Sequence, residues 1–265
     1  MEIQAKTVDV ALEPSREKRI FLQNETNEPY LHSRLYYTFR DEKTLVKALA
    51  RRKCIHFVDP KSFVVLYNHE AKNAPLFVPY NQIEAENITI LGEGSIRKNE
   101  LVIDISSAQR MLGVAQFMYK YVESKMAYIT HIVVKSELLV GAQEEIANKE
   151  FSEALASPDY DLLFNKEELL VKIETTLDYD KQLSREIPLI EVHKIANTKD
   201  GMNKLQMIST FAFFTAMLRE ENRQKGIERV TIEELTTFMA KRFDTMGRYN
   251  TEHVHDENCG HHHHD

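Results

Sequence analysis

The 265-residue sequence contains no tryptophan, eight glycines and two cysteines. With so few glycines, few backbone positions are free to form a loop that cradles phosphate, because such loops use conformations that other residues avoid. The sequence also lacks the Gly-x-x-x-x-Gly-Lys, Gly-x-Gly-x-x-Gly, Gly-x-Ser-x-Gly and His-Glu-x-x-His patterns. These absences lower the expectation of P-loop, dinucleotide-binding, serine-hydrolase or zinc-protease chemistry, although enzymes without a common motif exist.

Disulfide-forming cysteines and long apolar runs are missing as well. Cys54 and Cys259 lie far apart in the sequence and in unlike surroundings, so they do not make a disulfide framework, and a reducing compartment is expected. The segment Met1–Lys6 has no apolar signal core, and the longest apolar stretches are too short to span a bilayer. We therefore expect a cytoplasmic protein with no membrane partner.

An excess of positive charge is also missing. The formal net charge is −7, and four of the negative charges lie near the end of the chain, at Glu252, Asp256, Glu257 and Asp265. A protein that binds nucleic acid non-specifically needs a strong positive field to displace counterions, and the composition does not provide one. We therefore expect protein partners or self-association rather than nucleic acid. The Phe- and Met-rich stripe at 207–218 suits the core or a contact with a second subunit.

The chain contains a mixture of strand and helix patterns. Alternating apolar residues between turn signals predict strands at 8–12, 35–39, 54–58, 63–67, 76–79, 88–91, 101–105, 128–134 and 169–175. Gly92-Glu93-Gly94 is interpreted as a turn between two of these strands.

Apolar residues at helical spacing predict helices after Asp41, Ser106, Asp200 and Thr231, and a weaker helix over 142–157. Two of these starts have the spacing of a capping box, namely Ser106 with Gln109 and Thr231 with Glu234. Gly226 has the position of a helix C-cap.

These elements predict an α+β fold. We expect a mixed, mainly antiparallel sheet with packed helices, followed by a helical C-terminal portion and a disordered His-rich tail. The expected boundaries are 1–185 for the α+β body, 186–247 for the helical portion and 248–265 for the tail, because the composition turns helical from about Ile187.

The last thirteen residues concentrate metal-ligand chemistry. They hold six of the eleven histidines and one of the two cysteines. Imidazole nitrogen and thiolate sulfur suit Zn²⁺ and Ni²⁺, whereas Ca²⁺ and Mg²⁺ prefer oxygen. The candidate ligands are His253, His255, Cys259, His261, His262, His263 and His264. Because their spacing favours no single set of four, we expect an adaptable site on a mobile tail rather than a rigid structural site.

Two other interpretations of the tail are kept. An affinity tag would explain the run of four histidines, but a tag needs neither the His-x-His-Asp-Glu-x-Cys stretch before the run nor a final Asp265. The tail can also be a native, solvated segment that has no function.

The body offers weaker candidates. Cys54 and His56 place two metal-ligand side chains on one face of a predicted strand, but no second pair completes a tetrahedron, so a buried structural cysteine is favoured. His131 lies on an otherwise apolar strand face, where a hydrogen-bonded core histidine is favoured over a catalytic base. The two C-terminal helices have the order of a helix-turn-helix, but Glu233 and Glu234 in the first turn of the second helix would repel DNA phosphates.

Carboxylates two residues apart form a further candidate. Asp159 with Asp161, and Asp178 with Asp180, would each share a face on a strand and hold Mg²⁺ or act as acid and base, with Glu174 nearby. Loop or strand-end positions are favoured for these residues.

Three functional hypotheses follow. The leading one is a cytosolic metal-binding or metal-trafficking accessory protein, which captures Zn²⁺ or Ni²⁺ with its His/Cys tail. The second is a non-enzymatic interaction or structural component with an incidental tail. The third is a Mg²⁺-dependent hydrolase or nuclease without a common motif, using the two aspartate pairs.

Overall fold

The computed structural model shows the α+β fold that the sequence predicts. The residues it describes are 4–6, 19–24, 26–67, 89–122, 126–142, 146–165 and 183–251. The predicted strands at 8–12, 76–79 and 169–175 lie outside these residues. Among the described helices, none is long and apolar enough to cross a membrane.

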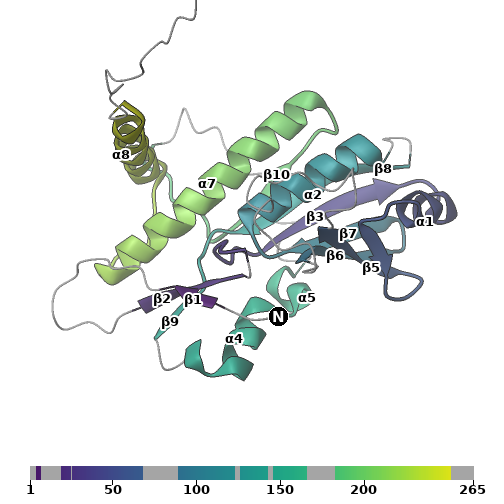
Figure 1. Ribbon diagram of the computed structural model, residues 1–265. Coiled ribbons are helices and arrows are strands. Elements are labelled where there is room, and N and C mark those ends of the chain that lie inside the picture. Colours follow the sequence, from purple (N-terminus) through teal and green to yellow (C-terminus); the bar gives the residue numbers. More distant parts are fainter. Residues whose placement is uncertain are drawn as a thin grey trace, which may run out of the picture.

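A seven-stranded antiparallel sheet forms the centre of the body (Figure 1). Its strands, in spatial order, are β10 (Ile190–Lys194), β8 (Ala127–Lys135), β3 (Ser33–Phe39), β7 (Glu100–Ile105), β6 (Thr89–Arg97), β5 (Ser62–Tyr67) and β4 (Ile55–Phe57). Every neighbouring pair is antiparallel, so the predicted sheet type is confirmed.

Helices cover the two faces of this sheet unequally. Helix α2 (Ala108–Tyr121) and helix α7 (Lys199–Gln224) lie side by side over one face, where the largest hydrophobic core forms (Figure 1). Helix α1 (Glu42–Ala50) closes the end of that core beside β4, and its N-cap is Asp41, as predicted. The short helix α5 (Tyr160–Leu163) contributes to a smaller apolar cluster on the opposite face.

A smaller sheet stands next to the main one. It consists of β1 (Gln4–Lys6), β2 (Arg19–Gln23) and β9 (Val140–Ala142). Ile20 and Leu22 of β2 pack with Tyr30 and with Ala156, the last residue of helix α4 (Lys149–Ala156). The weak helix predicted over 142–157 is shorter than expected: Ala142 belongs to β9, and the longest helical stretch in this range is α4.

The C-terminal helices build a core of their own. Helix α8 (Ile232–Thr251) packs on α7 through Phe214, Leu235 and Phe238. The predicted capping box is confirmed, since the Thr231 backbone N–H donates to Glu234 (2.8 Å) and the Glu234 N–H donates to the Thr231 hydroxyl (3.3 Å). Gly226 has a φ of +76°, the left-handed conformation that a helix C-cap requires.

Two predicted boundaries were wrong. Gly92 and Gly94 lie inside β6, and the chain turns after it at Lys98 and Asn99. A Cβ on Gly94 would lie 2.1 Å from the Phe63 ring, so this glycine makes room for a core aromatic and does not form a turn. Helix α2 is capped by Ser107 and not by Ser106, because the Ser107 hydroxyl accepts from the Arg110 N–H.

The start of the helical portion also needs correction. Residues Ile190–Lys194 form β10, the edge strand of the main sheet, so this portion begins with a strand. The strand pattern is hidden because Glu191 and His193 are buried, while Ile190 and Val192 are only half-buried. Helix α7 then begins after Thr198, whose hydroxyl accepts from the Gly201 N–H, and not after Asp200.

Candidate functional site

The predicted metal ligands of the tail lie outside the described residues. Helix α8 ends at Thr251, and the candidates that follow it in the sequence are His253, His255, Cys259, His261, His262, His263 and His264. The metal-binding prediction therefore continues to rest on sequence.

The body pair Cys54 and His56 does not converge. Cys54 is 2% exposed, and burial raises the pKa of its thiol to about 11, so the thiol stays protonated at neutral pH. His56 is exposed on β4. The prediction that the two side chains share one face was wrong, because Cys54 packs into the core before the strand begins. Within the described ranges, no three His, Cys, Asp or Glu side chains are placed to hold a metal ion.

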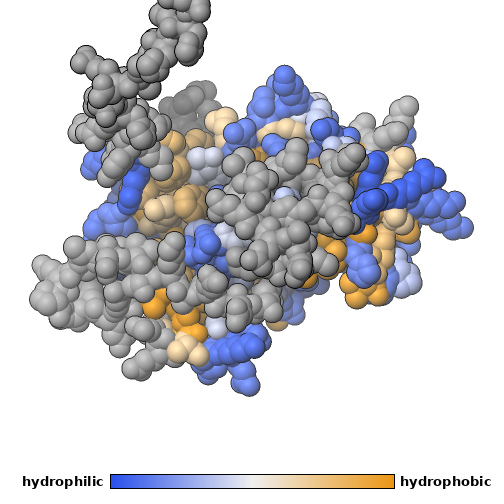
Figure 2. All heavy atoms as spheres, in the orientation of Figure 1, coloured by the Kyte–Doolittle hydropathy of each residue, from blue (hydrophilic) through white to orange (hydrophobic). Residues whose placement is uncertain are grey.

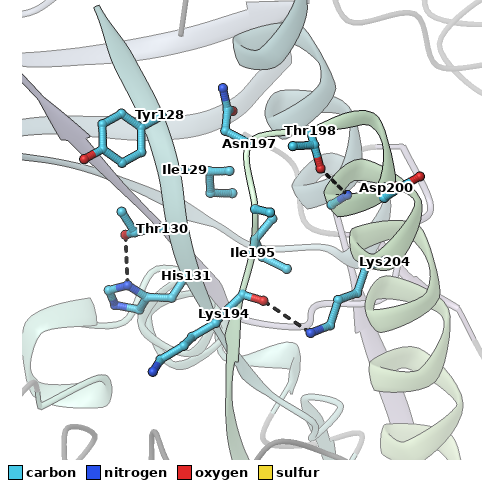
Figure 3. A pocket seen from close by; sticks show the side chains of 12 residues that line it. Tyr128, Ile129, Thr130, His131, Lys194, Ile195, Asn197, Thr198, Asp200 and Lys204 are labelled. Atoms are coloured by element: carbon cyan, nitrogen blue, oxygen red, sulfur yellow. Dashed lines mark hydrogen bonds between the residues drawn. The ribbon is translucent and has the colours of Figure 1, made fainter. Parts of the chain in front are cut away.

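A groove of about 820 Å³ lies where β8 extends past the end of β10 (Figure 3). The two strands pair as far as His131 opposite Lys194, and the Ile195 N–H then donates to the Thr130 carbonyl (3.0 Å). The start of β8 at Ala127–Ile129 has no β10 residue opposite it. The groove therefore runs along an open strand edge, which is the type of surface that can pair with another extended segment.

The polar groups around the groove serve the local fold. Thr198 caps α7, and the Lys204 ammonium lies 3.4 Å from the Lys194 carbonyl. A Cβ on Gly201 would lie 1.7 Å from the Ala196 carbonyl oxygen, so only glycine allows the first turn of α7 to approach this loop. These contacts fix the wall of the groove. The Thr130 hydroxyl lies 3.0 Å from His131 Nδ1, but it donates its hydrogen to the Tyr36 carbonyl (3.1 Å), so the two do not act as nucleophile and base.

His131 stands at this groove for a reason that the strand pattern does not show. Tyr36 pairs with His131 and Tyr37 pairs with Ile129, so Thr130 is an extra residue in β8. This bulge turns His131 away from the face of Ile129. The His131 ring is half-buried and stacks on Tyr36, with ring centroids 4.2 Å apart. The expectation of a core histidine is thus only partly met.

Arg34 organises a charged cluster on the sheet face that α5 covers. Its guanidinium makes two hydrogen bonds to the Asp104 carboxylate, from Nε and from Nη2 (2.5 and 2.9 Å), and a third to Asp161 (2.7 Å). Arg97 also donates to Asp161 (2.8 Å), so this carboxylate joins two arginines. Burial opposes ionisation of Asp161, but the bonds from Arg97 and Arg34 outweigh it and lower the pKa. Burial raises the pKa of Asp104, against the lowering effect of Arg34.

The aspartate pair that the sequence singled out is part of this cluster. Asp159 is the N-cap of α5, where its carboxylate accepts from the N–H groups of Asp161 and Leu162. The alternative of a strand with both carboxylates on one face does not apply here, because a helix begins between them, and the favoured position at the end of an element fits Asp159. Asp178 and Asp180 lie outside the described residues.

His32, the residue before β3, bonds to Tyr160 of α5 and to Leu155 of α4. A carbonyl can only accept, so the His32 Nε2 carries the hydrogen that points to the Leu155 oxygen (3.3 Å), and Nδ1 accepts from the Tyr160 hydroxyl (3.0 Å). Burial lowers the pKa of His32 from 6.5 to about 4, so the ring is neutral at pH 7. A hollow of about 150 Å³ lies next to this pair, and Tyr160, Asp104 and Glu93 are among the residues that line it.

A third polar cluster is buried beneath α7. The Ser136 hydroxyl donates to Glu191 (2.8 Å), and the other oxygen of Glu191 lies 3.5 Å from His193 Nε2. Arg219 of α7 donates to the Ile187 carbonyl, and burial lowers the pKa of this arginine. The carboxylate stands between the serine and the histidine, so the histidine does not take the serine proton as a catalytic base would.

Sequence reasoning missed these clusters because their members are far apart in the chain. Arg34 comes from β3, Asp104 from β7 and Asp161 from α5. The local signal was an arginine in a mostly apolar strand, which requires a buried partner.

Comparison with known proteins gives no relative. No protein-family model matches the chain, and no curated protein and no solved structure matches it. Any function of this chain must therefore be inferred from its own residues.

Proposed function

We propose that the chain is a transition-metal-binding accessory protein whose C-terminal tail captures Zn²⁺ or Ni²⁺. The observation that carries this proposal is the density of ligands between His253 and His264, where six histidines and one cysteine stand within twelve residues. Four nitrogen or sulfur donors complete a tetrahedral Zn²⁺ site, so the tail holds more donors than one ion requires.

The surplus of donors suits capture and transfer of metal. Cys259 would lose its proton on binding, because thiolate is the form that ligates, and neutral imidazoles would complete the set. Since several ligand sets compete, one donor can leave while another takes its place. A ligand on a receiving protein could then replace the donors one at a time.

The described body supports a scaffold role in this proposal. Its cysteine, Cys54, is buried and protonated, and the perturbed groups Arg34, Asp104 and His32 are each bonded to structural partners. Helix α8 packs on α7 through apolar side chains and begins at a capping box, and neither feature involves the candidate ligands of the tail. We therefore expect the body to fold without metal and to present the tail.

Substitution of the tail ligands tests the proposal. In isothermal titration with ZnCl₂ at pH 7.4, we expect about one metal per chain with micromolar to sub-millimolar affinity. Joint replacement of His253, His255 and Cys259 by alanine should weaken binding without abolishing it, because His261–His264 remain. His56→Ala, an exposed body histidine, is the matched control and should leave the affinity unchanged.

Acid gives an independent check. Binding should weaken sharply below about pH 6, because imidazoles with an ordinary pKa near 6.5 must be neutral to ligate. Binding that is unchanged between pH 7.4 and 5.5, or unchanged when all seven tail donors are replaced, would contradict the proposal.

A further inference from the structure

Helix α1 has an outward face that carries only positive charge. Leu45, Ala48 and Leu49 are buried against the core. Lys43, Lys47 and Arg51 follow one another at intervals of four on the exposed side, the first two within α1 and the third as its C-cap. At a rise of 1.5 Å per residue, this stripe is about 12 Å long.

The spacing is unfavourable for the isolated protein. Side chains four residues apart on a helix are neighbours, and like charges at that spacing destabilise the helix. A solvated helix more often alternates acids and bases on its exposed side. The stripe contains two such like-charge pairs, Lys43 with Lys47 and Lys47 with Arg51.

The acidic groups nearby offset only part of the stripe's charge: Asp41 attracts Lys43 electrostatically, and residues 40–61 still keep an excess of Lys and Arg. Asp41 caps the helix by accepting from the Thr44 N–H, and Asp59 accepts from two N–H groups of its own turn. Glu42 pairs with Lys61 (3.4 Å). Within the part of the chain that the structure describes, no ion pair is formed by Arg40, Lys43, Lys47, Arg51 or Lys53.

This basic end differs from the rest of the protein. Residues 40–61 contain seven Lys or Arg and three Asp or Glu, a net charge of +4, so the remainder of the −7 chain carries −11. At the end of the molecule that carries α1, hydrophilic side chains project into solvent beside exposed hydrophobic ones (Figure 2). Beside it, Val58 is 68% exposed in the turn whose Lys61 pairs with α1.

We infer that the basic stripe of α1, with Val58 at its edge, docks an acidic segment of a protein partner. A short segment with carboxylates about one helical turn apart matches the stripe in sign and length, and an apolar side chain of that segment can cover Val58. Nucleic acid and anionic membranes are extended polyanions that reach beyond the stripe to the rest of the chain, whose net charge of −11 repels them. A short acidic segment contacts the stripe alone. The inference concerns the body and does not depend on the tail.

Fluorescence anisotropy with defined probes tests this inference. The full chain, with EDTA to keep the tail free of metal, is titrated into a labelled 16-residue helical peptide that carries Glu at every fourth position and Leu between them. The same titration is made with a labelled 16-nucleotide single-stranded DNA and with vesicles that contain phosphatidylserine. We expect binding to the acidic peptide that weakens as salt is raised from 20 to 200 mM, with weaker binding to DNA and to vesicles.

Two triple variants separate the stripe from net charge. Lys43→Gln with Lys47→Gln and Arg51→Gln should weaken peptide binding about tenfold, as expected when three exposed ion pairs are lost. Its melting temperature should equal or exceed that of the parent chain, because the like-charge pairs are removed. The control variant replaces three exposed lysines elsewhere by Gln, namely Lys149, Lys204 and Lys225. It should bind the peptide like the parent chain.

Three results would overturn the inference. One is the same loss of peptide binding in both triple variants, which would show that net charge alone decides. Another is tighter binding of DNA or vesicles than of the peptide. The third is the absence of peptide binding at 20 mM salt.

Discussion

Acid should destabilise the protein through His32. This ring is 2% exposed and neutral, with both nitrogens committed to Tyr160 and to the Leu155 carbonyl. A proton on Nδ1 would place a charge in the buried space between β3 and α5 and would break the bond from Tyr160. The folded state therefore resists a proton that the unfolded chain accepts readily.

The magnitude follows from the two pKa values. Burial lowers the pKa of His32 in the folded state to about 4, against 6.5 for the exposed ring. Since a pKa difference of one corresponds to about 1.4 kcal/mol, the whole effect is about 3 kcal/mol. Because the folded pKa is depressed, the unfolded state binds the extra proton below pH 6.5, so this stability is present at pH 7 and is lost as the pH falls toward 4. Between pH 7 and pH 5 the loss is about 2 kcal/mol.

Urea denaturation at pH 7 and at pH 5 measures this loss. The parent chain is compared with His32→Gln, which does not titrate, and with His56→Gln, which removes an exposed histidine. All other groups are common to the three chains, so the difference in pH dependence belongs to the substituted ring. We expect His32→Gln to be less stable at pH 7 and to lose about 2 kcal/mol less than the parent chain on going to pH 5. An equal pH dependence in all three chains would refute the assignment of a buried, neutral His32.

Three further predictions concern stability. Phe214→Ala should lower the free energy of unfolding by about 3–5 kcal/mol, because Phe214 lies in the core between α7 and α8. Phe211→Ala should lower it less, because Phe211 is only half-buried. Denaturant midpoints measure both changes. Arg34→Met should lower the free energy of unfolding by about 3–5 kcal/mol, because it leaves Asp104 without its buried partner. If the double variant Arg34→Met/Asp104→Asn loses less stability than the two single variants together, the two residues are coupled. Removal of 252–265 should change the melting temperature little, and a loss above about 2 kcal/mol would show that the tail packs into the fold.

Helix starts and sheet type could be predicted from sequence where a local rule decides them. Asp41 and the pair Thr231 and Glu234 cap their helices as the spacing predicts. Strands with an apolar inner face, such as β3 and β5, were found for the same reason. The rules failed where a distant contact decides, as at Gly94, whose missing side chain is explained by a phenylalanine on the neighbouring strand.

The polar clusters show the same limit more strongly. The inner face of β10 carries Glu191 and His193, so its sequence does not resemble a buried strand. Glu191 can be buried because Ser136 donates to it and Arg219 attracts it electrostatically. The bulge at Thr130 reverses the face of every β8 residue on one side of it, and a single sequence gives no sign of it. The candidate metal ligands of the tail are the opposite case: their prediction depends on composition, needs no fold, and stays a prediction.

The most direct test of the proposed function is a ZnCl₂ titration of the full chain beside a chain that ends at Thr251, both at pH 7.4 and metal-free at the start. Helix α8 is retained in both, so the two differ only in the candidate ligands and their neighbours. We predict about one Zn²⁺ bound by the full chain, and at least a tenfold weaker affinity or no measurable heat for the shortened chain. Equal affinity in the two chains would contradict the proposal, because the metal site would then lie in the body.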